Sequence, residues 1–327
     1  MYVQPITEDL GVPPNHPIQE ITVTAIYFDS SMPDAERRRK LYGGDLFVYS
    51  PRPSLQRLVA FARGMLEEAF APYHPTEAQF HMPVEKFVEI FGPVKPRFIH
   101  HPETKKLIAD VVTDIGCDLE ETYLDVPRLR GVTSDGYLTA GVGYAHPPHR
   151  DTWWSAPLAQ LNWWIAIYPY ETESSMAFHQ RYWDVEVPNG SEEFDYYQWN
   201  AVGRKEAAKH IHTDTRKQPH PQIPIEYQPE VRLITPEAGL QIFSATQLHS
   251  TVANTTGKTR FSMDFRTVNV LDIAAGRGAP NMDSHPTGTS LRDFVRGTDQ
   301  AALDEALIAP YDIGSEFADA GVKVFKP

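Results

Sequence analysis

The most restrictive feature of this sequence is a series of short, strand-like runs in the second part of the chain. They follow Cys117 and are separated by turns rich in glycine, proline and serine: 121–130, 136–146, 160–168, 175–179, 231–235, 239–245, 248–253 and 259–270. Short apolar runs bounded by such residues are typical of β-structure. The alternation of strands with helices that a parallel βαβ sheet requires is not evident. We therefore expect a mainly β fold, with the strands closed into a barrel or packed as two sheets.

Helical periodicity dominates the chain before Cys117, where three helices are predicted. These three helices cover 54–70, the segment from Pro83 to a stop at Gly92-Pro93, and the segment from Pro102 to Gly116. A fourth helix is predicted near the end of the chain, at 299–308. Proline at a helix start and glycine just after its end are favoured because the first lacks a donor and the second tolerates a left-handed backbone. These helices are expected to pack outside the β-structure.

One domain is expected over 1–327, since no repeat or interdomain linker is evident. It divides into a helix-rich N-terminal part at 1–118, a β-core at 119–270 and a C-terminal extension at 271–327. Within the core, segment 184–230 is polar and is predicted to be a long insertion. Long loops inside compact domains often cover a site.

Composition excludes several classes of protein. The formal net charge of −13 argues against non-specific nucleic-acid binding, which needs clustered lysine and arginine, and is explained most simply by solubility. No run reaches the 18 apolar residues that a membrane span needs, and no signal peptide is expected at the N-terminus. The single cysteine, Cys117, excludes an intramolecular disulfide and a cysteine-based zinc site. It fits a reducing cytoplasm, which is the predicted location.

A candidate metal site begins at His149-Arg150-Asp151. In an extended chain, residues i and i+2 face the same side, so His149 and Asp151 can bind one ion while Arg150 points away. His249, on a later strand-like run, is the candidate third ligand. Two histidines and one carboxylate leave coordination positions open, which is the arrangement found in non-haem iron(II) oxygenases. These three residues are therefore predicted to be the iron ligands and the catalytic centre.

A second H-x-D pattern provides an alternative that must be weighed. It lies at His212-Thr213-Asp214, within the polar insertion and without a surrounding strand pattern. We interpret it as part of a solvated loop.

Arg260 is the candidate anchor for a co-substrate. It follows His249 by eleven residues across a turn, so a hairpin would return it to the metal side. Arginine pairs with carboxylates through two parallel hydrogen bonds, and Ser262 lies on the same face two residues later. Together these residues suit the distal carboxylate of 2-oxoglutarate.

Substrate contacts are harder to predict from the sequence. Trp153 and Trp163, with their neighbours Trp154 and Trp164, could form an aromatic wall of the site, or they could equally be core residues. Arg266 shares a face with Arg260 if the strand is unbroken. It could bind an anionic group of the substrate, or it could form a structural ion pair with Asp264 or another acid.

The chain resembles the phytanoyl-CoA dioxygenase-like family of iron(II)- and 2-oxoglutarate-dependent oxygenases. The resemblance covers roughly 120–270 and is carried by HRD at 149–151, LNWWIAIYP, SSMAFHQRYW and GLQIFSATQLHSTVANTTGKTRFSMDFR. It implies a double-stranded β-helix, a cupin-like jelly-roll barrel with helices packed outside. It also implies that the HRD run, His249 and Arg260 hold the metal and the co-substrate. Halogenating members lack the carboxylate ligand, whereas this chain keeps Asp151.

These observations together predict a dioxygenase that uses iron(II), 2-oxoglutarate and O2 to oxidise a small-molecule metabolite. The expected reaction is hydroxylation of an unactivated C–H bond, with release of succinate and carbon dioxide. No nucleic acid or membrane is expected as a partner. Two alternatives remain open: a cupin-like metal enzyme that does not use 2-oxoglutarate, and a non-catalytic β-barrel binding protein.

Overall fold

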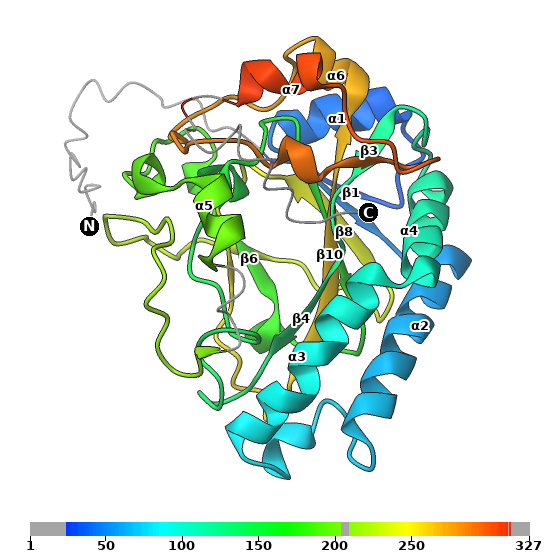
Figure 1. The fold of residues 1–327 in the computed structure, drawn as a ribbon, viewed down its shortest axis with the longest axis vertical. Helices are drawn as coiled ribbons and strands as arrows, with labels where there is room; N and C mark the ends of the chain where they lie inside the picture. The colour runs from blue at the N-terminus through cyan, green and yellow to red at the C-terminus, as the bar shows by residue number, and fades with distance from the viewer. Residues whose placement is uncertain (1–23, 204–208, 313, 315–327) are drawn as a thin grey trace, which may run out of the picture.

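The structure is a computed structural model that describes residues 24–203, 209–312 and 314, and it is rich in sheet (Figure 1). The larger sheet contains β1 (Ile26–Phe28), β2 (Leu46–Tyr49), β3 (Thr122–Leu124), β4 (Arg128–Val132), β5 (Leu161–Ala166), β8 (Leu240–Ser244), β10 (Arg260–Asn269) and β11 (Val295–Arg296). Its strand order is β1-β2-β8-β5-β10-β3-β11, and β4 also pairs with β10. The sheet is mixed, because β1 and β2 pair in parallel and the other pairs are antiparallel.

A smaller sheet lies against the larger one. It has the order β7-β6-β9 and contains β6 (Met176–Phe178), β7 (Val231–Arg232) and β9 (His249–Thr251). Met176 and Phe178 of the smaller sheet share one apolar cluster with Val48, Trp164 and Phe243 of the larger sheet. Alternate residues of the larger sheet therefore face the smaller one, as a period of two requires. The described strands form these two separate sheets, which confirms sheet-rich architecture with helices at its flanks.

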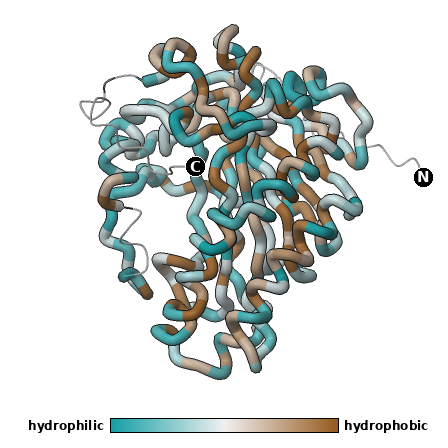
Figure 2. The backbone as a smooth tube through the Cα atoms, turned by 45° about the vertical axis from the view of Figure 1, so that its right-hand side comes forward, coloured by the Kyte–Doolittle hydropathy of each residue, from teal (hydrophilic) through white to brown (hydrophobic). Residues whose placement is uncertain are grey.

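Helices of the N-terminal part cover the opposite face of the larger sheet. The helices of the described residues are α1 (Asp34–Tyr42), α2 (Pro53–Phe70), α3 (Val84–His100), α4 (Pro102–Asp114), α5 (Tyr196–Ala201), α6 (Val270–Ala274) and α7 (Glu305–Ile308). In Figure 1, α2, α3 and α4 lie together along one side of the molecule. Phe261, Met263 and Phe265 of β10 belong to the large apolar core that also contains Phe70 and Phe91 of these helices. Figure 2 shows hydrophobic and hydrophilic stretches interleaved along the chain, as expected for amphipathic elements.

The second predicted helix is longer than expected. We expected a stop at Gly92-Pro93, but α3 continues to His100 with Pro93 and Pro96 inside it. This prediction was wrong because the apolar face outweighs the two missing backbone donors: Phe91, Val94 and Phe98 are all buried. In contrast, α2 and α4 lie where the periodicity predicted them.

The run 136–146 is not a strand, contrary to prediction. It forms a turn-rich loop that passes close to β4: a Cβ atom on Gly143 would lie 2.9 Å from the carbonyl oxygen of Gly131. The apolar side chains of this loop point inwards, and Leu138 and Val142 belong to the main core. Near the C-terminus, the helix predicted at 299–308 is limited to Glu305–Ile308.

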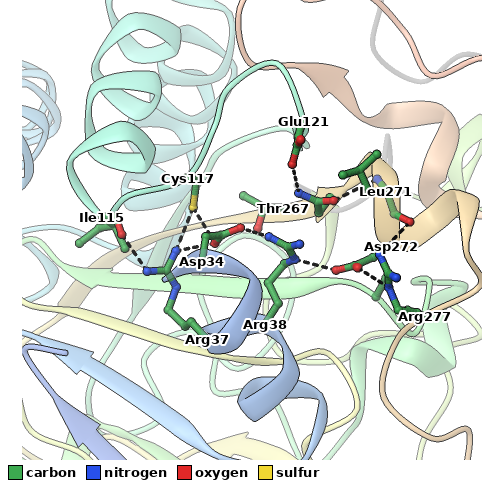
Figure 3. A network of polar contacts seen from close by, with 12 residues as sticks. Asp34, Arg37, Arg38, Ile115, Cys117, Glu121, Thr267, Leu271, Asp272 and Arg277 are labelled. Carbon is green, nitrogen blue, oxygen red and sulfur yellow. Dashed lines mark hydrogen bonds and ion pairs between the residues drawn. The ribbon is translucent and has the colours of Figure 1, made fainter. Parts of the chain in front are cut away.

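The N-terminal part is tied to α6, which directly follows β10, by a buried polar network (Figure 3). Arg38 of α1 donates to Asp272 of α6 at 2.6 Å, and Arg37 donates to the carbonyl oxygen of Ile115 at 2.7 Å. Arg37 also lies 3.1 Å from the Cys117 sulfur, and burial raises the pKa of that thiol. The helix-rich part is therefore integral to the fold, and it contributes strands β1 and β2 to the larger sheet. Among the described residues we find no helix whose length and hydrophobicity would let it cross a bilayer.

Candidate metal centre

His149, Asp151 and His249 come together at the inner edge of the smaller sheet. His249 is the first residue of β9, and its backbone exchanges two hydrogen bonds of 2.9 Å with His149. The Asp151 amide donates to the carbonyl oxygen of Ala245 at 2.9 Å, which fixes the start of a short 3-10 helix. As a result, one ligand atom from each of the three side chains lies within 4.8 Å of the others. The structure therefore forms the 2-His-1-carboxylate cluster that the sequence predicted.

Both histidine rings are oriented by backbone carbonyl groups. The Nδ1 atom of His149 donates to the carbonyl oxygen of Pro147 at 2.7 Å, and Nδ1 of His249 donates to that of Gln247 at 3.0 Å. Because a carbonyl oxygen only accepts, the proton of each neutral ring is on Nδ1 and the lone pair is on Nε2. Hydrogen bonds of this kind set the tautomer and ring direction of metal-binding histidines. The donor set therefore fits a divalent metal ion.

Electrostatics also favour the states that a metal requires. Burial lowers the pKa of His249 to about 4, with the neighbouring His149 acting in the same direction, so His249 is neutral at neutral pH. Burial opposes ionisation of Asp151. However, the polar contact with the His149 ring at 3.5 Å, the neighbouring His249 ring and the Arg130 guanidinium hold the pKa of Asp151 well below its usual range. Neutral imidazole and ionised carboxylate are the forms that bind metal ions.

Arg150 points away from the cluster, as predicted, and anchors the segment between the two ligands from the other side. Its guanidinium is fully buried and donates to Asp283 at 3.0 Å and to the carbonyl oxygen of Thr246 at 2.5 Å. Asp283 also accepts from Trp153 Nε1 at 2.8 Å and from the Val187 amide at 3.0 Å. This buried pair holds the His149-to-Asp151 segment in place without touching the cluster.

The carboxylate of Asp151 has two further neighbours. Nη2 of Arg266 lies 3.5 Å from Oδ2 of Asp151, and Nε2 of Gln160 donates to the same oxygen at 3.4 Å. Arg266 also lies 3.4 Å from Asp125 and 3.4 Å from Asp264. The structure thus gives Arg266 the acidic neighbours that the structural interpretation required, and one of them belongs to the metal cluster.

A cavity of about 320 Å³ opens beside the cluster and contains Arg260. The guanidinium of Arg260 lies over the ring of Trp164, with a distance of 5.4 Å from its central carbon to the ring centroid. Its Nε and Nη1 atoms are buried and have no hydrogen-bond partner in the part of the chain that the structure describes. Burial lowers the pKa of Arg260 to about 10, which leaves it cationic at neutral pH. Buried cations without partners are costly, so this group is suited to an anionic ligand.

The remaining predicted site residues have different positions. Ser262 is fully buried two residues from Arg260, and its hydroxyl has no partner among the described residues. Trp153 and Trp163 do not line the cavity. Trp153 is bonded to Asp283 behind the cluster, and Trp163 stacks on Phe265 in the core beneath the helices. The geometry therefore does not support either tryptophan as a substrate contact. In β5 the strand alternation turns Trp164 towards the cavity instead of Trp163, whereas Trp153 and Trp154 lie in the short 3-10 helix.

The neighbouring tryptophans, Trp154 and Trp164, line the cavity. The second H-x-D pattern takes no part: His212 is exposed, and Asp214 binds Arg216 and Gln218. Its segment is partly described, since residues 204–208 lie outside the described ranges. Sequence reasoning missed several other polar lining residues: Lys95, Asp125, Arg128, Arg130, His146 and Asn162. Apart from Asn162, they lie outside the runs that carry the resemblance.

Comparisons with known proteins give only distant similarity. No protein-family profile matches the chain, and no curated protein matches it. A solved structure of EvdO2 from Micromonospora carbonacea var. aurantiaca complexed with 2-oxoglutarate is 13% identical, with 73% of this chain and 91% of that chain covered and a TM-score of 0.41. The apo non-heme monooxygenase ThoJ is 13% identical, with coverages of 79% and 85% and a TM-score of 0.36.

The epimerase SnoN, solved in complex with Fe3+, alpha ketoglutarate and nogalamycin RO, is also 13% identical. It covers 72% of this chain and 85% of its own, with a TM-score of 0.36. At this level of similarity, function has to be inferred from the site itself.

Proposed function

We propose that this chain is an iron(II)- and 2-oxoglutarate-dependent oxygenase of the double-stranded β-helix type. In this proposal His149, Asp151 and His249 hold the iron, and Arg260 with Ser262 holds the distal carboxylate of 2-oxoglutarate. Bound iron would activate O2, with 2-oxoglutarate converted to succinate and carbon dioxide and a C–H bond of a small-molecule metabolite oxidised, most simply by hydroxylation. The buried, free Cys117 thiol is consistent with a reducing cytoplasm.

The observation that carries the proposal is the guanidinium of Arg260, which lies in the same cavity as the 2-His-1-carboxylate cluster and has two nitrogens without a partner among the described residues. A metal cluster alone fits many cupin-like enzymes. A buried cation beside it fits a chelating ligand that carries a second carboxylate at its far end. The two sheets packed face to face, with the cluster on β9 of the smaller sheet, suit the proposed β-helix.

Each residue of the site has a distinct role in this proposal. His149 and His249 present Nε2 to the metal because their Nδ1 protons are held by backbone carbonyl groups. Asp151 supplies the single anionic ligand, and its charge is supported by Arg266 at 3.5 Å. Trp164 covers the guanidinium of Arg260 and keeps water from one side of it. These residues bind, orient and exclude water, while the metal supplies the redox chemistry.

The test is O2-dependent formation of succinate from 2-oxoglutarate by the purified protein with added iron(II). Alanine variants of His149, Asp151 and His249 should each lose this turnover and also lose the thermal stabilisation given by Mn(II) and 2-oxoglutarate. His212→Ala is the matched control, because this histidine belongs to the second H-x-D pattern and is exposed. Full turnover in the three ligand variants, or loss of turnover in the control alone, would contradict the assignment.

A further inference from the structure

We propose that the substrate carries an anionic group, a carboxylate or a phosphate, and that Lys95 binds it. This inference deepens the proposed oxygenase function and rests on it. Lys95 lies on α3, outside every segment that carries a recognisable motif, and it lines the cavity that contains the metal cluster. It would therefore be a specificity-determining residue that the helix-rich N-terminal part supplies to the β-core.

Lys95 has no carboxylate partner in the described part of the chain. Its Nζ atom donates to the carbonyl oxygen of Val142 at 2.9 Å and lies 5.4 Å from the centroid of the Phe91 ring. An ammonium group has three donors, so one backbone carbonyl leaves hydrogen-bonding capacity unused. By contrast, Lys86 on the same helix is exposed and pairs with Glu89 at 3.2 Å. Lys95 is therefore a cation held at the cavity without its own counter-charge.

The charges around the cavity do not cancel. Six cationic side chains line it, against the three carboxylates of Asp125, Asp151 and Asp264. The carboxylates are engaged by three arginines: Arg128 lies 2.7 Å from Asp125, Arg130 lies 2.6 Å from Asp264, and Arg266 contacts all three acids.

The other three cations are accounted for separately. Arg216 is paired with Asp214, which is not a lining residue, and Arg260 is reserved for 2-oxoglutarate. If the two negative charges of the co-substrate offset the divalent metal, Lys95 and Arg260 carry the remaining excess of positive charge. Arg260 is already in contact with the co-substrate in this proposal, so Lys95 is the cation left to face a second ligand. A cavity with this excess favours a second anion and disfavours a cationic ligand.

The environment of Lys95 supports the same conclusion. Burial lowers the pKa of Lys95 to about 7, and Arg130 acts in the same direction. The free ammonium is thus poorly stabilised at neutral pH, and an anion beside it would restore the charged form. Purely structural lysines have no need for such a position, since a neutral residue of similar length would pack against Phe91 at lower cost.

The experiment measures anion binding in the assembled site, using inorganic phosphate and acetate as probes. The protein is loaded with Mn(II) and saturating 2-oxoglutarate, which occupies Arg260. Paramagnetic enhancement of 31P relaxation for phosphate and of 13C relaxation for acetate reports each probe near the metal. Both probes test an anionic group, and the one that binds more tightly distinguishes phosphate from carboxylate chemistry.

Lys95→Met is expected to weaken binding of the preferred probe about ten- to one-hundred-fold, the range for losing a hydrogen bond to a charged group. Lys95→Arg should retain binding, and Lys86→Met should match the wild type. Lys95→Gln serves as a second neutral variant should the methionine variant lose its fold. The inference is overturned if neither probe binds the wild type. It is also overturned if both neutral variants bind the preferred probe as tightly as the wild type does. These outcomes differ from failure of the proposed function, in which 2-oxoglutarate itself would not bind the Mn(II) protein.

Discussion

Replacing Arg260 with methionine should make the ligand-free protein more stable and at the same time remove its response to 2-oxoglutarate. The guanidinium is buried, and two of its nitrogens have no partner among the described residues. Methionine has a similar reach and carries no charge, so it can occupy the space beside Trp164 without this penalty. Arg260 thus lowers the stability of the ligand-free folded protein, and this cost is the counterpart of its suitability for binding an anion.

The size of the effect follows from the pKa of Arg260. Burial lowers it from the ordinary 12.5 to about 10. At about 1.4 kcal/mol for each tenfold change, this costs the folded state about 3 kcal/mol. Because the folded state disfavours the cation, the penalty is fully present below the folded pKa and disappears as the pH rises towards the ordinary pKa. The contact with Trp164 offsets about 1 kcal/mol of it. We therefore expect Arg260→Met to raise the free energy of unfolding by about 2 kcal/mol at neutral pH.

Urea denaturation of both proteins, with and without Mn(II) and 2-oxoglutarate, measures these effects. The wild type should gain stability from 2-oxoglutarate, whereas the variant should bind it with an affinity lower by about 2–5 kcal/mol. Arg63→Met is the control, because this arginine lies on the helical side and has Glu237 as an ion-pair partner. A variant that is less stable than the wild type and still stabilised by 2-oxoglutarate would refute this reasoning.

Two further predictions concern the supports of the cluster. Asp283→Ala should lower the free energy of unfolding by about 3–5 kcal/mol in urea denaturation, because it leaves the buried Arg150 unpaired; an unchanged midpoint would show that the pair contributes nothing. Arg266→Gln should weaken Mn(II) binding about ten- to one-hundred-fold by releasing Asp151 from its neighbour at 3.5 Å, measured by calorimetric titration. Unchanged Mn(II) affinity with weaker substrate binding would instead assign Arg266 to substrate recognition.

The sequence was sufficient to predict the cluster because its residues lie on regular, local patterns. His149 and Asp151 are two residues apart, and His249 lies within a recognisable strand-like run. The alternation in β10 also correctly separated Phe261 and its apolar neighbours from Arg260 and its charged ones. A period of two determines which face a residue takes, and both faces of this strand have a clear chemical character.

The loop at 136–146 and the helix beyond Gly92-Pro93 could not be predicted in this way. In both cases tertiary contacts decide the outcome. The loop passes beside β4 without pairing with it, and β4 has β10 as its only strand partner among the described residues. Instead Leu138 and Val142 of the loop are buried in the main core. The helix continues through two prolines because Phe98 and Val94 reach the core only if it does. Neither the available sheet edges nor the depth of the core is visible in a local pattern.

The same limitation explains why the cation on α3 was missed, and it also gives that helix a functional meaning. Had α3 stopped at Gly92-Pro93, Lys95 would lie in a connecting loop. The continued helix instead fixes Lys95 against Phe91 and aims its ammonium at the loop that carries Val142. That loop lies outside the sheet and lines the cavity. The two departures from the predicted fold therefore meet at one place, where Lys95 and the loop both line the cavity that contains the metal cluster.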